Sequence, residues 1–130
     1  MIALDTNILA RLLLADDAAQ LARVKSLLGK KQNYTAPITV MLELVWVLEA
    51  NDCTPTEIER GINLLLGLAN FKPASTQELK QALAWYADGL GFADALHLAL
   101  SQDAKQLVTF DKKFVKMAKK CGVGLTVIEA

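Results

Sequence analysis

Residues 1–10 read Met-Ile-Ala-Leu-Asp-Thr-Asn-Ile-Leu-Ala, and this stretch indicates the architecture expected for the whole chain. The apolar residues 2–4 predict a short strand. Asp5 follows the strand directly and is a residue type that caps helices, and residues 8–14 have helical character. We therefore expect a strand, a sharp turn and a helix, with Asp5 at the turn.

The rest of the chain repeats this alternation of short apolar strands and helices. Further strands are predicted at residues 33–36, 71–73, 107–110 and 125–128, and helices at residues 17–28, 37–50, 54–66, 75–87, 92–102 and 111–121. Such alternation predicts an α/β fold in which helices wrap a parallel sheet. No repeat or linker interrupts it, so we expect one domain, residues 1–130, with a small, mainly parallel sheet of four or five strands.

Local signals mark several helix ends. Asp17 is expected to be an N-cap, and Gly29 is expected to end the same helix as glycine commonly does. Pro55 suits the first turn of a helix, where its missing N–H would have no partner. Ser75 and Glu78 have the spacing of a capping box.

The composition limits the possible function without identifying it. The chain has 130 residues and is 53% hydrophobic, which is enough for one core. Its 14 Lys and Arg residues balance 14 Asp and Glu residues, so a nucleic-acid substrate must be inferred from a local site. Cys53 and Cys121 form no CxxC motif, and no signal peptide or membrane-spanning segment is evident. We expect a cytoplasmic protein that does not bind membranes.

Three isolated carboxylates are the most informative residues. Asp5 is the only charged residue among the first ten, Glu43 the only one between residues 36 and 48, and Asp94 the only one between residues 89 and 102. Their apolar surroundings predict burial, and a buried ionised carboxylate needs a counter-charge or a metal ion. Only Arg11 lies close enough in sequence to be a partner. We therefore expect these acids to bind a cation.

The predicted positions of the acids favour convergence. Asp5 and Asp111 each follow a strand, at the sheet edge where α/β proteins bind ligands. Asp94 lies in the first turn of its helix, and Glu43 lies further inside a helix. Carboxylate oxygens are ligands that Mg²⁺ prefers. Asp5 and Asp111 could instead be simple helix caps, a reading that the lysines after Asp111 favour for that residue.

Two further features of the sequence each have two possible roles. His97, the single histidine, lies one turn after Asp94, where it could be a core residue or a catalytic one. The last predicted helix carries a group of lysines that could be a solvated face or could guide a phosphate backbone. These lysines are Lys112, Lys113, Lys116, Lys119 and Lys120.

Four segments resemble the PIN-domain nucleases. They are Leu-Asp-Thr-Asn-Ile-Leu at Asp5, Leu-Glu-Leu-Val-Trp-Val-Leu at Glu43, Phe-Ala-Asp-Ala-Leu-His-Leu-Ala at Asp94 and Val-Thr-Phe-Asp-Lys-Lys-Phe at Asp111. The match is in order over essentially the whole chain. Within that family the sequence is most similar to the VapC-type toxins of toxin–antitoxin pairs.

The resemblance implies a three-layer α/β/α domain with a ribonuclease activity that depends on Mg²⁺ or Mn²⁺. It implies that Asp5, Glu43, Asp94 and Asp111 are metal ligands and catalytic residues. Polar residues beside them, Thr6, Asn7 and Thr109, are implied to orient ligands or water. It also implies RNA as the substrate, a homodimer, and an antitoxin protein that inhibits the enzyme.

Three other functions are weighed against a nuclease. A phosphatase of the haloacid dehalogenase type has a second Asp two positions after the first, but this chain has Asn7 there. A receiver-type signalling domain usually has paired acids after its first strand and a lysine late in the sheet. A non-catalytic binding module of the same fold is the strongest alternative, although all four acids are present.

Overall fold

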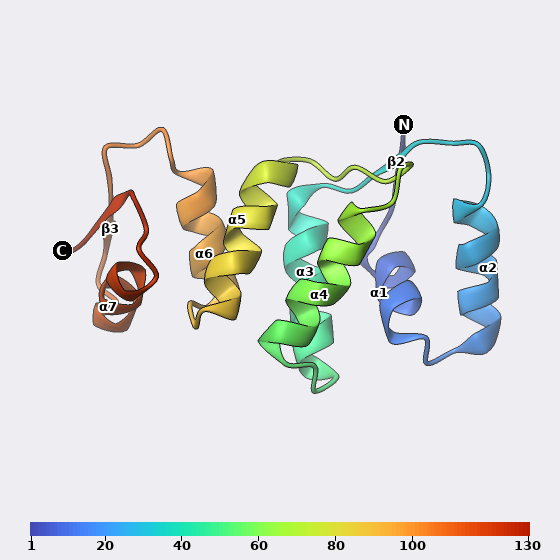
Figure 1. Cartoon of the computed structure of the whole chain (residues 1–130), viewed down its shortest axis with the longest axis horizontal. Coiled ribbons are helices and arrows are strands. Elements are labelled where there is room, and N and C mark those ends of the chain that lie inside the picture. Colours follow the sequence, from blue (N-terminus) through green and yellow to red (C-terminus); the bar gives the residue numbers. More distant parts are fainter. The chain divides into compact units, whose positions relative to one another are not determined.

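The computed structural model describes residues 1–130, which form two compact units, unit 1 (Met1–Thr76) and unit 2 (Gln77–Ala130). Each unit combines a pair of short parallel strands with helices (Figure 1). Within each pair, the two strands are therefore connected through helices, as parallel strands require.

Unit 1 contains two strands and four helices. They are β1 (Ile2–Ala3), α1 (Thr6–Leu14), α2 (Ala18–Leu28), β2 (Tyr34–Thr35), α3 (Ile38–Ala50) and α4 (Pro55–Leu66). Strand β1 pairs in parallel with β2, with Ile2 opposite Tyr34, and Tyr34 also forms a parallel bridge with Phe71. The predicted strand at residues 71–73 is thus a single bridge.

Helix α1 packs between α2 and α3 in unit 1 (Figure 1). Its Leu9 is almost inaccessible to solvent, as are Met41 and Leu44 of α3 and Ile62 of α4. Removing a side chain of this size from water contributes about 1.5–3 kcal/mol to the free energy of unfolding. This packing holds the first turn of α1 against α3, which places the residues after β1 beside that helix.

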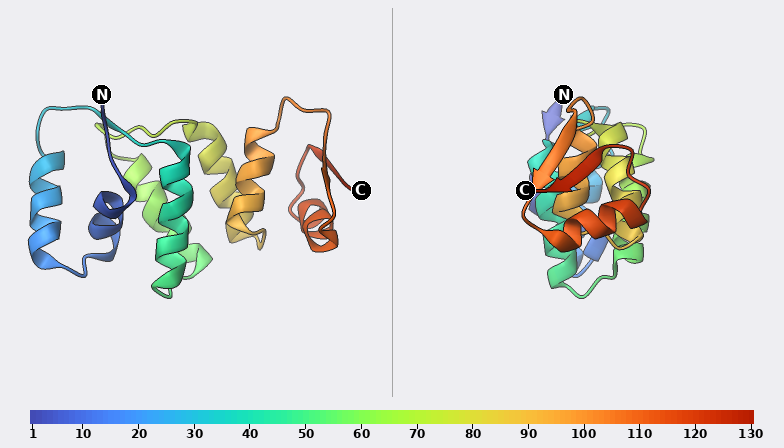
Figure 2. Two further views of the ribbon diagram at one scale, coloured as in Figure 1. Left: turned by 180° about the vertical axis from the view of Figure 1, so that it is seen from behind. Right: turned by 90° about the vertical axis from the view of Figure 1, so that its left-hand side faces the viewer.

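Unit 2 contains most of α5, which begins at the boundary, and four further elements. The elements are α5 (Thr76–Ala87), α6 (Phe92–Leu100), β3 (Gln106–Thr109), α7 (Lys112–Lys120) and β4 (Thr126–Glu129). Strands β3 and β4 pair in parallel, with Gln106 opposite Thr126. Helix α7 connects them and packs on both strands, as the right-hand view of Figure 2 shows.

Most buried residues of unit 2 belong to α5 and α6. Leu79 and Leu83 of α5 and Leu98 of α6 are fully buried. The rings of Tyr86 and Phe92 meet edge to face, with their centroids 5.5 Å apart. This packing fixes the start of α6, where Asp94 lies.

The predicted α/β class with short parallel strands is confirmed, and the helix and strand bounds agree within two residues. Gly29 ends α2 as predicted, but with φ −77°, without the left-handed conformation common at a terminal glycine. The predicted start of α5 is wrong in detail. Ser75 has φ 55° and therefore lies outside the extended conformation of an N-cap, so the predicted capping box with Glu78 does not form.

None of the helices is both long enough and apolar enough to cross a lipid bilayer.

Candidate functional site

Asp5 lies where β1 meets α1 and is the N-cap of α1. The backbone N–H of Thr6 donates to Oδ1 of Asp5 over 2.7 Å. The carboxylate is exposed, and its second oxygen has no protein hydrogen bond. Asp5 is therefore a helix cap, as the alternative interpretation had it, but the cap leaves one of its oxygens without a protein partner.

Glu43 lies beside Asp5 in a pocket of unit 1. The pocket has a volume of about 280 Å³ and is lined by Asp5, Thr6, Asn7, Ala10, Arg11, Glu43 and Val47. We call it the acidic pocket. The packing of α1 on α3 brings these two acids together although they are far apart in sequence.

Thr6 adds an unsatisfied polar atom to the acidic pocket. Its side chain is buried, 7% exposed, and its hydroxyl oxygen has no hydrogen-bond partner. Because buried polar groups are nearly always paired, this hydroxyl needs a partner from a water or a ligand. Thr6, predicted as a supporting residue, therefore lines the same pocket as Asp5 and Glu43.

Asp94 and Asp111 form a second pair of acids, in unit 2. Asp94 lies in the first turn of α6 and is half-buried, and one of its oxygens lies over Gly91. Burial raises the pKa of the Asp94 carboxyl above its ordinary value, and the negative charge of Asp111 raises this pKa further. His97, one turn later on α6, lowers the pKa of the same Asp94 carboxyl through its charge.

Asp111 is the N-cap of α7, two residues after the end of β3. Its Oδ1 accepts from the backbone N–H of Phe114 over 3.1 Å. The backbone N–H of Asp111 donates to Oγ1 of Thr109 over 3.1 Å. Thr109, predicted as a supporting residue, thus helps to hold the backbone that carries Asp111.

None of the four acids is paired with a lysine or arginine. Arg11, the nearest cation to Asp5 in sequence, is bound to Asp16 instead, with 2.6 Å between Nη1 and Oδ1. The individual ion pairs that would have excluded a cation site are therefore absent. Neither unit by itself gathers three or more Asp, Glu, His or Cys side chains closely enough to hold a metal ion.

The expected burial is wrong for two of the three isolated acids. Asp5 and Glu43 are exposed, and only Asp94 is half-buried, while Asp111 is exposed as the lysines after it indicated. Apolar neighbours in sequence did not predict burial because a helix can bury its apolar faces and still direct one side chain to solvent. Exposure lowers the cost of keeping these acids ionised and ready for a cation.

Gln20 and Arg23 were not predicted from the sequence as candidate functional residues. Both line a second pocket of unit 1, between α1 and α2. A signal was present, because Gln20, Arg23, Val24 and Leu27 have the i, i+3, i+4, i+7 spacing of one helix face.

Short parallel strands, covering helices and unpaired carboxylates at strand-to-helix turns define an α/β protein with a carboxylate-rich candidate site. The chain belongs to the PIN domain family, which matches residues 2–120. The PIN domain is a three-layer α/β/α nuclease fold, and its members are usually hydrolases that act on RNA or DNA, generally with divalent metals such as Mg²⁺. A comparison with curated proteins found no match to this chain.

The raised pKa of Asp94 predicts a stability effect in the metal-free protein. The folded chain holds this proton more tightly than the unfolded chain, so the free energy of unfolding falls as pH rises from the ordinary pKa through the raised one. At neutral pH the ionised Asp94 therefore opposes folding. We expect Asp94→Asn to raise the free energy of unfolding at neutral pH, by less than about 1 kcal/mol because solvent screens a half-exposed charge.

Urea denaturation of the metal-free protein at neutral and at acidic pH measures this effect. The gain should disappear at acidic pH, where Asp94 is protonated in both states. Asp103→Asn, at an exposed position of the same unit, is the matched control and should change little. A destabilising Asp94→Asn at neutral pH would contradict the prediction.

Proposed function

We propose that this PIN domain protein is a divalent-metal-dependent endoribonuclease that hydrolyses phosphodiester bonds of RNA. The observation that carries the proposal is the set of four carboxylates without counter-ions, arranged as the pairs Asp5–Glu43 and Asp94–Asp111. Unpaired carboxylates near one another repel, and a divalent cation relieves that repulsion. Membership of a family with a nuclease fold supports the same function.

The residues present fit Mg²⁺ or Mn²⁺. The donors are carboxylate oxygens, and Mg²⁺ is commonly held by one or two carboxylates while it keeps several waters. The unpaired Thr6 hydroxyl beside Asp5 could receive a hydrogen bond from such a water. A bound cation would polarise the scissile phosphate and lower the pKa of a water.

We assign a role to each residue on this basis. Asp5 and Asp94 are the principal ligands: Asp5 caps α1 with one oxygen and keeps the other free, and Asp94 is the one half-buried acid of the four. Glu43 binds the cation or orients the attacking water. Asp111 completes the shell or holds a second ion. Thr6, Asn7 and Thr109 position ligands and water beside these acids.

From the similarity to the family, we propose that both pairs of acids serve one metal centre and that residues 1–130 act as one domain. The pattern of four acids in order spans both units, and the family match also does. Calorimetric titration with Mn²⁺ tests this point. If Glu43→Gln and Asp111→Asn each abolish the same Mn²⁺-binding event, one shared centre is supported. If the two variants abolish different binding events, one shared centre is contradicted.

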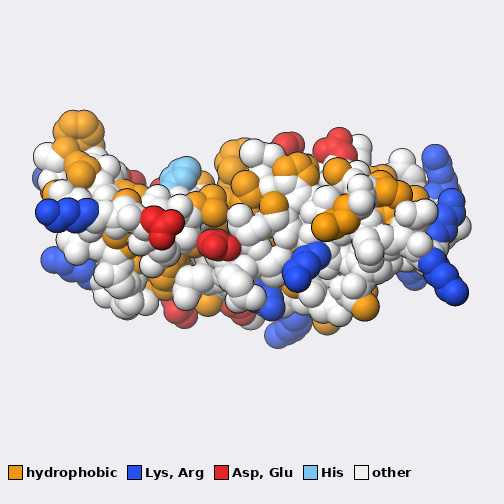
Figure 3. All heavy atoms as spheres, turned by 90° about the horizontal axis from the view of Figure 1, so that it is seen from above, with side chains coloured by type: hydrophobic (Ala, Val, Ile, Leu, Met, Phe, Trp, Pro, Cys, Tyr) orange, Lys and Arg blue, Asp and Glu red, His pale blue; other side chains and the backbone are white.

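The basic face of α7 is proposed to hold the RNA backbone near Asp111. Lys113 and Lys116 are exposed and have no acidic partner. Lys112 forms a long ion pair with Glu129, with 3.9 Å between Nζ and Oε1. Basic side chains stand out on the part of unit 2 that holds β3, β4 and α7 (Figure 3). Such lysines attract phosphates without reading sequence, so zero net charge is compatible with an RNA substrate.

We further propose that the protein is the toxin of a toxin–antitoxin pair, acting in the cytoplasm as a homodimer that a cognate antitoxin inhibits. The similarity of the sequence to VapC-type toxins supports this assignment. The side chains of Trp46 on α3 and Leu64 on α4 are 52% and 69% exposed, which suits a surface that another chain covers. Light scattering of the purified protein measures the mass, and a monomer would contradict the dimer.

A non-catalytic PIN-fold binding module is the alternative. Binding of RNA does not by itself need unpaired acids in two places, and this favours the enzyme. A phosphatase of the haloacid dehalogenase type is not proposed, because the chain belongs to the PIN domain family.

Cleavage of RNA by the purified protein separates the enzyme from the binding module. We expect cleavage of single-stranded RNA with Mg²⁺ or Mn²⁺, and its complete loss with EDTA, because carboxylates alone cannot activate water at neutral pH as a bound metal does. Re-addition of Mn²⁺ should restore activity. RNA that is bound but left intact with either metal would favour the binding module.

A further inference from the structure

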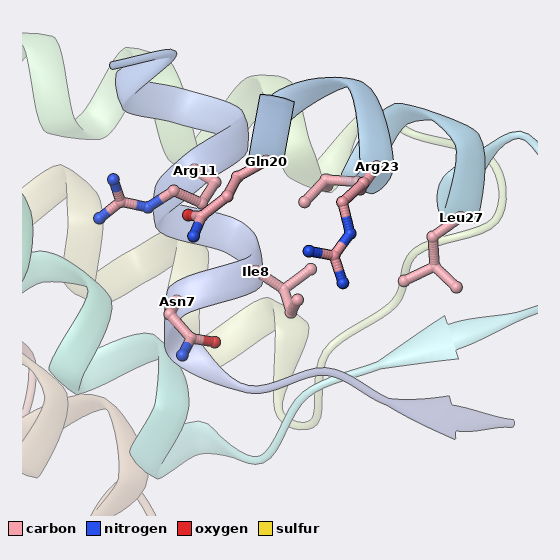
Figure 4. A pocket seen from close by; sticks show the side chains of 7 residues that line it. Asn7, Ile8, Arg11, Gln20, Arg23 and Leu27 are labelled. Carbon is pink, nitrogen blue, oxygen red and sulfur yellow. The ribbon is translucent and has the colours of Figure 1, made fainter. Parts of the chain in front are cut away.

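A second pocket of unit 1 lies between α1 and α2 and is not explained by the four acids. It has a volume of about 360 Å³ and is lined by Asn7, Ile8, Arg11, Gln20, Arg23, Val24 and Leu27 (Figure 4). The volume lies in the range of small-ligand pockets, roughly 300–1,000 Å³. Its lining combines aliphatic side chains with two amides and two guanidinium groups, which is a surface for an amphipathic ligand. We call it the arginine pocket.

Arg23 is the uncompensated cation of the arginine pocket. It is exposed and has no hydrogen bond or ion pair. Figure 4 shows its guanidinium extending from α2 into the space above Ile8. The guanidinium of Arg11 points away from Arg23, and its charge is neutralised by Asp16. An unpaired guanidinium in a pocket is a strong donor for a phosphate, which it can bind through two N–H groups.

The arginine pocket adjoins the acidic pocket. Asn7 and Arg11 line both, because they are one turn apart on α1. An RNA strand that is held at Asp5 and Glu43 can therefore continue along α1 toward Arg23. The charges suit such a strand, because a cation at the acids and a guanidinium further along would both face phosphates.

We propose that the arginine pocket binds a nucleotide of the RNA strand beside the one that is cleaved. Arg23 holds its phosphate, Ile8, Val24 and Leu27 contact its sugar and base, and the amides of Asn7 and Gln20 hydrogen-bond the base. The proposal rests on the proposed ribonuclease function, of which it names a substrate subsite. An acidic protein segment would also satisfy Arg23, but the aliphatic floor together with two amides fits a nucleobase better.

Binding of RNA without cleavage tests the proposal. The parent is the full chain with Asp5→Asn, kept in EDTA, and the probe is a short fluorescein-labelled single-stranded RNA followed by anisotropy over a series of salt concentrations. Adding Arg23→Gln should weaken binding about tenfold, as expected for loss of one charge-assisted contact. The slope of log K against log salt should fall by about 0.7, the share of one phosphate in a single strand.

Lys25→Gln is the matched control, because it removes the same charge from an exposed position of α2 that does not line the pocket. It should leave the affinity near that of the parent, and Arg23→Lys should retain part of it. Thermal melting should show that all variants are folded, since Arg23 has no hydrogen bond or ion pair to lose.

Equal weakening by Arg23→Gln and Lys25→Gln would overturn the proposal, because it would reduce Arg23 to general surface charge. RNA binding independent of Arg23, together with Arg23-dependent binding of a hexaglutamate peptide, would also overturn it and assign the pocket to an acidic protein segment. Arg23-dependent RNA binding by a wild-type protein that cleaves no RNA would support the subsite while the nuclease function failed.

Discussion

Asp5→Asn should lower metal-dependent RNA cleavage by at least about 100-fold. Loss of residues that only support metal ligands typically costs 10–100-fold in metal affinity or activity, so loss of a direct ligand should cost no less. The substitution keeps the shape of the side chain and removes only the negative charge. It therefore tests whether the charge of Asp5 is needed for cleavage.

The fold should survive this change. Asn is as good an N-cap as Asp, and its Oδ1 can still accept from the N–H of Thr6, the one hydrogen bond that the Asp5 side chain makes. Urea denaturation should give a free energy of unfolding close to that of the wild type. Loss of activity could then not be attributed to unfolding.

Asp17→Asn is the matched control for this experiment. Asp17 is also an N-cap, of α2, and its Oδ1 accepts from the N–H of Gln20 over 3.0 Å. It lines neither the acidic pocket nor the arginine pocket. This variant should cleave RNA like the wild type. Full activity of metal-free-prepared Asp5→Asn, after addition of Mg²⁺, would remove Asp5 from the mechanism.

Expression of the wild-type chain without an antitoxin should stop or strongly slow bacterial growth, whereas the Asp5→Asn form should not. Enzymes commonly turn over about 1–1,000 substrates per second, so a few copies of an active ribonuclease can inactivate an essential RNA pool. A 100-fold slower variant should fall below the rate at which the cell replaces that RNA. Growth of cells with the Asp5→Asn form is therefore expected to be close to normal, although some RNA cleavage could still be measured in the test tube.

Growth curves after induction, with protein amounts compared by immunoblot, measure this effect. Asp17→Asn should remain as toxic as the wild type, which separates loss of catalysis from a general effect of mutating a cap. Equal growth of cells that contain similar amounts of the wild-type and Asp5→Asn forms would sink the toxin assignment. It would leave the nuclease itself to be judged by cleavage of RNA in vitro.

The sequence predicted the local structure well, because local structure depends on neighbours along the chain. Asp17 caps α2, and the start of α4 at Pro55 is confirmed, with a capping box between Thr54 and Glu57. The strands at the two ends of the chain lie within one or two residues of their predicted positions. Apolar periodicity and cap chemistry act over three or four residues, so these elements can be read without knowing the fold.

The sequence also identified the acids of the candidate site, through their isolation and the resemblance to a family to which the chain belongs. It could not show that Glu43 shares a pocket with Asp5, or that Asp111 acts on the pKa of Asp94. Those relations depend on packing between elements that are far apart along the chain. Exposure was misjudged for the same reason, since the neighbours that bury a side chain are mostly not its neighbours in sequence.

By itself, then, the sequence determined the order of strands and helices, their caps and the chemical nature of the candidate site. Only the tertiary structure decided which charges remain unpaired. Arg11 stands near Asp5 in sequence but binds Asp16, and Arg23 is left without a partner over the side of α1. The physical reason is that electrostatic energy depends on distance and solvent exposure in three dimensions, and both are set when α1 and α2 pack.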